Sequence, residues 1–207
     1  MTHISMSRRD SLQFGALGAA GLTLGSFATA ACAADAPKLA PITKAVPSTG
    51  EKLPVIGLGT NQYGVQTPEE MAALQQVLET MLAQGGSVVD TARAYGRSEE
   101  VIGELVQKIG KRDRLFISTK PSIRGDFSDP KAEVQAAFDP LKVSKIDLLL
   151  IHNLAGLDAL MPEFIRAKEA GKVRYIGMST STDNQYEGQM AGMRKYPLDF
   201  IQVDYSI

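Results

Sequence analysis

The sequence predicts an α/β fold in which parallel strands are joined by helices. Strand-like and helix-like segments alternate without exception from residue 55 to residue 205, which is the pattern of parallel strands with helical crossovers. The strand-like segments are nearly continuous apolar runs, as expected where both faces of a sheet are covered. A doubly wound open sheet and a (β/α)8 barrel both fit this pattern.

The first half of this body contains three strands and two helices. We expect the strands at 55–60, 87–90 and 115–120. Thr67 and Glu70 form a capping box with Pro at the first helical position, which predicts a helix to about residue 84. Its apolar face comprises Leu74, Val77, Leu78, Met81 and Leu82. Ser98 is expected to cap the second helix, whose apolar stripe is Val101, Ile102, Leu105, Val106 and Ile109.

The second half repeats the alternation. Asp129-Pro130 opens a third helix, which Asp139-Pro140 should interrupt, because proline cannot continue a helix without a kink. Three further strands are expected at 146–151, 173–178 and 200–205. Between them lie helices at 157–170 and 184–194.

The N-terminal residues have the composition of an export signal. Arg8-Arg9 precedes a charge-free, Gly/Ala-rich stretch over 14–31, and A-x-A cleavage sites follow at 28–30 and 31–33. Residues 1–33 therefore resemble a bacterial twin-arginine signal peptide, which implies the twin-arginine export machinery as a partner and a periplasmic or exported protein. Contact with a membrane is expected only through an uncleaved signal. Residues 34–52 are expected to form a linker, with a short hairpin around 48–50.

Composition excludes several classes of function. The formal net charge is −1, so nothing indicates a nucleic-acid partner. A single cysteine allows no internal disulfide. Gly57-Leu58-Gly59 lacks the third glycine of a dinucleotide fingerprint, where Gln62 stands. We find no metal-ligand cluster, Walker loop or nucleophile elbow in the sequence.

Polar side chains stand at the ends of five predicted strands. In chain order they are Asp90 (with Tyr95 on the following loop), Lys120, His152, Ser179-Thr180 and Gln202. Each is weak evidence alone, since a single lysine after a strand is usually solvated and a single histidine is more often structural. In a barrel, however, all these strand ends lie on the face where such enzymes work.

These side chains could share one reaction. The pKa of tyrosine is about 10, and a nearby ammonium lowers it. We therefore expect Lys120 to lower the pKa of Tyr95 and Asp90 to hold and neutralise Lys120. His152 could donate a hydrogen bond to a substrate oxygen. The set fits the protonation of a carbonyl oxygen while a cofactor delivers a hydride to the carbon.

Four segments together resemble the aldo-keto reductase superfamily, over about residues 42–207. They are Asp90-Thr91-Ala92 with Tyr95-Gly96, Ser118-Thr119-Lys120, Asp147-Leu148-Leu149-Leu150-Ile151-His152, and the run from Gly171 to Ser179. The resemblance implies a (β/α)8 TIM barrel and NADP(H), with NAD(H) as the alternative cofactor. It further implies reduction of an aldehyde or ketone, a small carbonyl substrate, with Tyr95 as general acid. A non-catalytic NADPH-binding barrel acting as a regulatory subunit is the alternative function.

The resemblance also implies a role for each strand-end residue. Lys120 and Asp90 would tune Tyr95, and His152 would orient the carbonyl. The implied cofactor-binding residues are Asp90, Ser179, Thr180 and Gln202, with Ser179 and Gln202 on the nicotinamide carboxamide. Thr180 stands where family members usually carry asparagine.

The sequence stops shortly after its sixth predicted strand. Six strands cannot close an eight-stranded barrel, so we expect residues 53–207 to form an incomplete barrel with exposed strand edges. The expectation is a fragment of a longer protein, or a truncated product, with weak cofactor binding and low activity.

Overall fold

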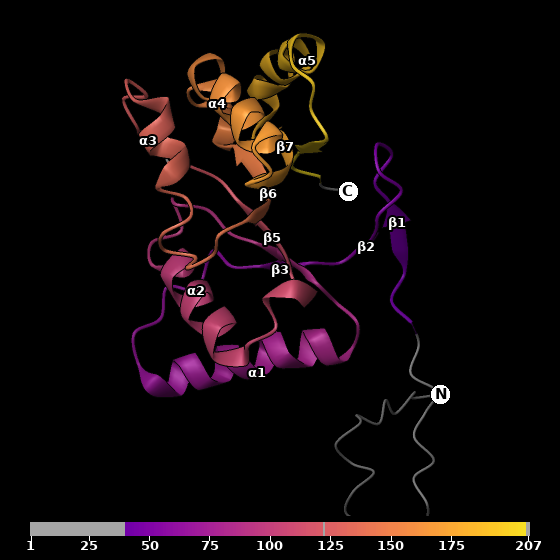
Figure 1. Ribbon diagram of the computed structural model, residues 1–207, viewed down its shortest axis with the longest axis vertical. Coiled ribbons are helices and arrows are strands. Elements are labelled where there is room, and N and C mark those ends of the chain that lie inside the picture. Colours follow the sequence, from indigo (N-terminus) through magenta and orange to yellow (C-terminus); the bar gives the residue numbers. More distant parts are fainter. Residues whose placement is uncertain (1–39, 122, 206–207) are drawn as a thin grey trace, which may run out of the picture. The chain divides into compact units, whose positions relative to one another are not determined.

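The computed structural model describes residues 40–121 and 123–205. Their main feature is a parallel sheet with the strand order β3-β4-β5-β6-β7-β8 (Figure 1). The strands are β3 (Leu58–Gly59), β4 (Val88–Asp90), β5 (Phe116–Thr119), β6 (Ile146–Ile151), β7 (Val173–Ser179) and β8 (Phe200–Gln202). Each strand pairs with its neighbour in the sequence, whereas a doubly wound sheet reverses its order at a switch point. The sheet is therefore part of a (β/α)8 barrel, as predicted.

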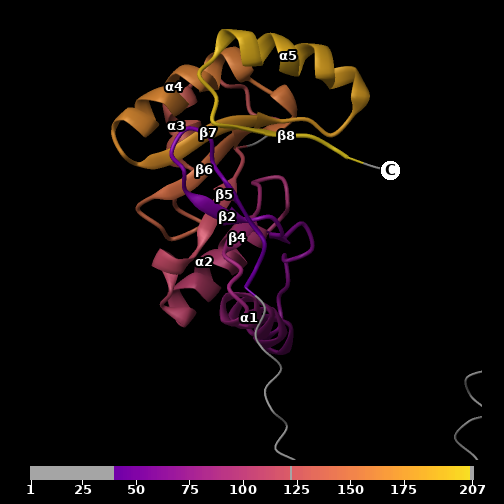
Figure 2. The same cartoon turned by 90° about the vertical axis from the view of Figure 1, so that its right-hand side faces the viewer.

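Helices follow the strands around the outside of the sheet (Figure 1). They are α1 (Pro68–Ala83), α2 (Ser98–Ile109), α3 (Pro130–Gln135), α4 (Leu157–Glu169) and α5 (Tyr186–Lys195). Short 3-10 turns occur at η2 (Arg112–Arg114), η3 (His152–Leu154) and η4 (Asp183–Gln185). In Figure 2, α1 and α2 lie beside the β4 end of the sheet, and α4 and α5 lie beside the β7–β8 end.

Two predicted helix starts are confirmed. Thr67 Oγ1 accepts a hydrogen bond from Glu70 N at 3.2 Å, and Glu70 Oε2 accepts one from Thr67 N at 3.1 Å. Asp129 Oδ1 accepts from Ala132 N at 3.0 Å at the start of α3. In both cases a side-chain oxygen satisfies a backbone N–H that the helix leaves without a partner.

The predicted cap of α2 is wrong. Ser98 is the first residue inside the helix, and its hydroxyl donates to Thr60 O at 2.7 Å. A buried hydroxyl needs a hydrogen-bond partner, and here the acceptor is a backbone oxygen of the loop after β3.

Val77 is also not part of the buried face of α1, because Leu78 and Leu82, one helical turn apart, point inward instead.

Four strands are shorter than predicted, β4 and β5 by one or two residues and the first and sixth by more. At the first, only Leu58–Gly59 pairs with β4, because Val55 N instead donates to Ile42 O at 3.0 Å. Val55 therefore bonds beside the hairpin, and only the later part of the run 55–60 joins the parallel sheet. The sixth strand ends at Gln202 rather than at residue 205.

Alternating residues of the sheet pack into two separate cores. Val89, Ile117, Leu149 and Met178 belong to a large cluster that includes residues of α1, α2 and α4. The opposite face contributes Phe116, Leu148, Leu150 and Tyr175 to a smaller cluster with Val46. All six residues of β6 are buried, which explains why this strand reads as a continuous apolar run.

The smaller cluster is bounded by an antiparallel hairpin, β1 (Thr43–Ala45) and β2 (Lys52–Pro54). The sequence predicted this hairpin around residues 48–50. Gly50 lies in its turn with a φ of 74°, a conformation that glycine adopts at little cost.

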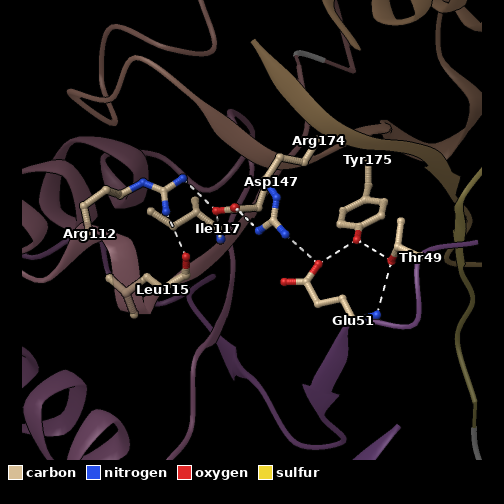
Figure 3. Close-up of polar contacts among 8 residues, drawn as sticks. All are labelled: Thr49, Glu51, Arg112, Leu115, Ile117, Asp147, Arg174 and Tyr175. Carbon is tan, nitrogen blue, oxygen red and sulfur yellow. Dashed lines mark hydrogen bonds and ion pairs between the residues drawn. The ribbon is translucent and has the colours of Figure 1, made fainter. Parts of the chain in front are cut away.

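A polar network fixes the hairpin to the sheet, and Asp147 lies at its centre (Figure 3). Its carboxylate accepts from Arg112 at 2.6 Å, from Ile117 N at 2.8 Å and from Arg174 at 2.8 Å. Arg174 also binds Glu51 at 2.6 Å.

The hairpin side of the network is completed by one tyrosine. Tyr175 donates to Glu51 at 2.6 Å, and its oxygen lies 2.7 Å from Thr49 Oγ1. The network therefore joins β5, β6 and β7 to the hairpin (Figure 3).

The predicted signal peptide, residues 1–33, lies outside the described residues. Within the described ranges, none of the helices is long and apolar enough to cross a lipid bilayer.

Replacing Asp147 with alanine should destabilise the fold, because two guanidinium groups and a buried N–H lose their acceptor. The free energy of unfolding should fall by about 2–3 kcal/mol, since Arg112 and Arg174 are partly exposed and water screens them. Urea unfolding measures the change. The exposed Asp113→Ala is the control and should shift it by less than about 0.5 kcal/mol. Equal effects of the two substitutions would contradict the central role of Asp147.

Candidate active site

The sheet register brings four of the predicted site residues to one edge. Asp90 ends β4 and is paired in register with Ser118 of β5, two residues before Lys120. Tyr95 lies on the loop after β4, and His152 follows β6 directly. Because the carboxyl ends of parallel strands meet at one edge, residues distant in sequence become neighbours there.

Lys120 is the most deeply buried member of the group, with 1% of its surface exposed. Its Nζ donates to Asp90 Oδ1 at 2.8 Å, Asp90 Oδ2 at 2.7 Å and Thr91 O at 2.9 Å. An ammonium has three hydrogens, so this set satisfies all of them. Burial lowers the pKa of Lys120, and the charge of Asp90 opposes that effect. Ser118 Oγ adds a hydrogen bond to Asp90 at 2.9 Å.

Tyr95 lies between Lys120 and His152. Its ring centroid is 5.4 Å from Lys120 Nζ, and its ring meets that of His152 edge-on at 6.1 Å between centroids. Burial raises the pKa of Tyr95, and the negative charge of Asp90 raises it further. The net shift is therefore opposite to the expected lowering, because burial, the larger cause, and the charge of Asp90 both raise the pKa. At neutral pH Tyr95 carries its proton.

His152 is neutral at physiological pH. Burial, followed by the positive charge of Lys120, lowers its pKa to about 4. Its Nδ1 is buried and has no hydrogen-bond partner within residues 40–121 and 123–205. After His152 the chain turns sharply, with positive φ values at Asn153 (52°) and Leu154 (61°). Such strained positions are frequently found beside functional groups.

The hydroxyl of Ser179, a predicted cofactor contact, has two protein partners. It donates to Ile151 O at 3.1 Å and accepts from Asn153 N at 3.1 Å. These two residues flank His152, so Ser179 joins the end of β7 to the histidine turn.

Gln202 and Thr180, the other predicted cofactor contacts, also reach this edge. Gln202 Nε2 lies 3.4 Å from Asp90 Oδ2, which joins β8 to the site. Thr180 N donates to Gln202 O at 2.9 Å, and its hydroxyl lies 3.4 Å from Gln189 Oε1. Gln202 thus contacts one catalytic candidate, Asp90, while Thr180 is held by backbone and by Gln189.

A groove of about 550 Å³ runs along the inner face of the sheet, below this edge. Its walls include Val88, Phe116, Leu148, Leu150 and Phe200, with Asp90, Ser118 and Gln202 at one end and the hairpin at the other. Tyr95 and His152 do not line it. The groove is therefore space on the inner face of the barrel sheet.

Sequence reasoning missed three residues around the site. Ser118 binds Asp90, and its position two residues before Lys120 puts both on one face of β5, a period that could have identified it. Glu99 is buried beneath Lys120 and Arg93 contacts it. A glutamate in the first turn of a helix ordinarily indicates only a favourable charge at the helix N-terminus, and no signal marked Arg93.

Comparisons with known proteins find relatives of this chain. A profile described as the aldo/keto reductase family matches residues 55–207. The aldo-keto reductase yakc [NADP(+)] of Schizosaccharomyces pombe is 29% identical over 173 residues, which are 75% of this chain and 50% of yakc. YhdN of Bacillus subtilis, also an aldo-keto reductase, is 28% identical over 181 residues, 78% of this chain and 53% of its own length. The chain thus spans about half the length of the curated relatives that it matches.

Solved structures give the same result. The thermostable aldo-keto reductase Tm1743, in complex with the inhibitor epalrestat, has a TM-score of 0.64 and 27% identity and covers 79% of this chain and 62% of its own. An aldo-keto reductase of Bombyx mori in complex with NADP has a TM-score of 0.61 at 21% identity, with coverage of 81% and 59%. The second likeness shows the fold alone.

His152 should titrate near pH 4 instead of 6.5. The unfolded histidine takes a proton as pH falls below about 6.5, while the folded one stays neutral until about 4. The contribution of His152 to stability should therefore be complete above pH 6.5 and decline as pH falls toward 4. Proton NMR of the imidazole, assigned with His152→Gln, measures the titration. A midpoint near 6.5 would contradict the buried, neutral state.

Proposed function

The chain belongs to the aldo/keto reductase family, and on this premise we propose that it carries the proton-transfer site of an NADP(H)-dependent carbonyl reductase. One observation supports the proposal most directly. The ring of Tyr95 meets that of His152 edge-on and also lies beside Lys120, whose ammonium is held by Asp90. The proposed reaction is reduction of an aldehyde or ketone to an alcohol.

In the proposed reaction Tyr95 gives its proton to the carbonyl oxygen. The raised pKa keeps the phenol protonated until the substrate oxygen becomes basic. As the proton leaves, negative charge develops on the phenol oxygen, and the ammonium of Lys120 stabilises it electrostatically. His152, neutral with one N–H, donates to the carbonyl oxygen and orients it. The reduced nicotinamide, when bound, supplies the hydride.

The residues at the strand ends fit a nicotinamide to different degrees. Gln202 has a side-chain amide next to Asp90, where it can bind a carboxamide through complementary donor and acceptor atoms. Ser179 would have to share its hydroxyl, because Ile151 O and Asn153 N already use it. We therefore propose Gln202 as the main carboxamide contact from this chain and Ser179 as a minor one, with Asp90 and Thr180 beside them.

The choice of NADP(H) over NAD(H) is supported by relatives. The printed name of the Schizosaccharomyces pombe relative includes NADP(+), and the Bombyx mori structure is a complex with NADP. The chain spans about half of its curated relatives, so the carbonyl substrate and the activity of the whole protein remain proposals.

Tyr95→Phe should abolish turnover and leave cofactor binding near normal. Loss of a general acid typically lowers the rate by about 10²- to 10⁴-fold, and this substitution removes the proton that Tyr95 would donate. NADPH consumption with a panel of aldehydes and ketones measures turnover, and quenching of NADPH fluorescence measures binding. Undiminished turnover in Tyr95→Phe would overturn the assignment. Tight NADPH binding by the unmodified protein, without turnover of any carbonyl, would favour the regulatory subunit instead.

We also propose that residues 1–33 direct export through the twin-arginine route. A folded fluorescent protein fused behind this segment should reach the periplasm of a bacterial host. Replacing both Arg8 and Arg9 with lysine should keep it in the cytoplasm, and replacing the two nearby serines, Ser7 and Ser11, is the control. Cell fractionation reads out the location. Export of the double-lysine fusion would contradict this route.

A further inference from the structure

Glu99 is a buried carboxyl with no role in the reaction above. It lies in the first turn of α2, and only 3% of its surface is exposed. Its neighbour Glu100 is the opposite case, a half-exposed side chain paired with Arg97 at 3.0 Å. A carboxyl out of water costs stability unless it is paired and hydrogen-bonded. The partners of Glu99 therefore indicate its structural role.

Both partners of Glu99 belong to segments that carry catalytic candidates. Thr119 Oγ1 donates to Glu99 Oε1 at 2.6 Å, and Thr119 immediately precedes Lys120. Arg93 Nε lies 3.4 Å from Glu99 Oε2, and Arg93 is on the loop that presents Tyr95. One carboxyl thus contacts the end of β5 and the tyrosine loop together.

The same two segments also meet through their backbones. Arg93 N donates to Lys120 O at 3.0 Å, and Thr91 N donates to Ser118 O at 2.9 Å. The guanidinium of Arg93 additionally contacts Ala136 O. Arg93 is 40% exposed at its side chain, so without Glu99 its guanidinium would keep the contact to Ala136 O and would be less restrained against turning toward water.

We propose that Glu99 is a positioning residue that holds the Tyr95 loop against the Lys120 end of β5. The carboxyl acts on Tyr95 through Arg93 and on Lys120 through Thr119. It touches neither the substrate nor the phenol. The inference rests on the proposed function for its effect on turnover, but the positioning itself is a property of the protein alone.

Charge and burial agree with this role. Burial raises the pKa of Glu99, while Thr119, Arg93 and Lys120 counter that effect in this order. Glu99 also favours the charged form of Lys120, although less than Asp90 does. Two carboxyls therefore favour the charged form of Lys120, Asp90 through direct contact and Glu99 without it.

The test compares Glu99→Ala, Glu99→Gln and the control Glu100→Ala, in the full chain. The first reporter is the imidazole of His152, because its ring protons sense the edge-on ring of Tyr95. In Glu99→Ala these NMR signals should move toward their positions in Tyr95→Leu. Glu99→Gln, which can still accept from Thr119, should move them less, and Glu100→Ala should leave them in place.

Thr119→Val is a second, independent variant in case Glu99→Ala does not fold. It keeps the shape of a fully buried side chain and removes the donor to Glu99. The His152 signals should shift in the same direction as in Glu99→Ala. Unshifted signals in whichever of these variants folds would overturn the inference.

Turnover gives the second reading. Misplacing a reacting group by about 1 Å can cost on the order of a hundredfold in rate, so kcat should fall roughly ten- to hundredfold in Glu99→Ala with KM changed less than about threefold. Glu99→Gln should recover most of the loss. An unmodified protein without turnover would contradict the proposed function alone. Unshifted His152 signals would contradict the positioning role alone.

Discussion

The structure around the site depends on one requirement, that a buried ammonium must find acceptors for its three hydrogens. Lys120 finds them in the carboxylate of Asp90 and in Thr91 O. This arrangement requires the end of β4 to lie beside the end of β5, and it fixes the start of the loop that presents Tyr95. Burial is the larger cause of the raised pKa of Tyr95 and of the lowered pKa of His152, and the ion pair adds to each shift, through Asp90 and Lys120 respectively. A proton donor and a neutral hydrogen-bonding partner thus follow from burial beside one ion pair.

The fold could be predicted to the level of parallel strands with helical crossovers. Strand β6 matches its predicted bounds, and the caps at Thr67 and Asp129 are where the sequence placed them. Local patterns decide such features, because apolar runs and capping residues act over a few positions. The resemblance to a known family went further and predicted the barrel, which the strand order, a long-range property, confirms. Ser98 was misassigned because its acceptor, Thr60 O, is distant in the sequence.

The candidate site, like the fold, could be predicted only in part from the sequence. The meeting of Asp90, Tyr95, Lys120 and His152 could be predicted, since carboxyl ends of parallel strands gather on one face. The direction of the pKa shift of Tyr95 could not, because it depends on burial and on which charge lies nearer. The double engagement of Ser179 depends on the sharp turn after His152, and that turn uses positive φ angles at two non-glycine residues. Sequence patterns carry little information about such backbone strain.

The hairpin network around Asp147 occupies the other end of the same strand. Asp147 on β6 and His152 directly after it are five positions apart, which corresponds to about 16 Å along an extended strand. Residues this far apart without shared partners usually contribute independently to stability. The attachment of the hairpin to the sheet and the chemistry at the strand ends can therefore change independently of each other. A protein engineer, or natural selection, could strengthen one end of the sheet while leaving the other unaltered.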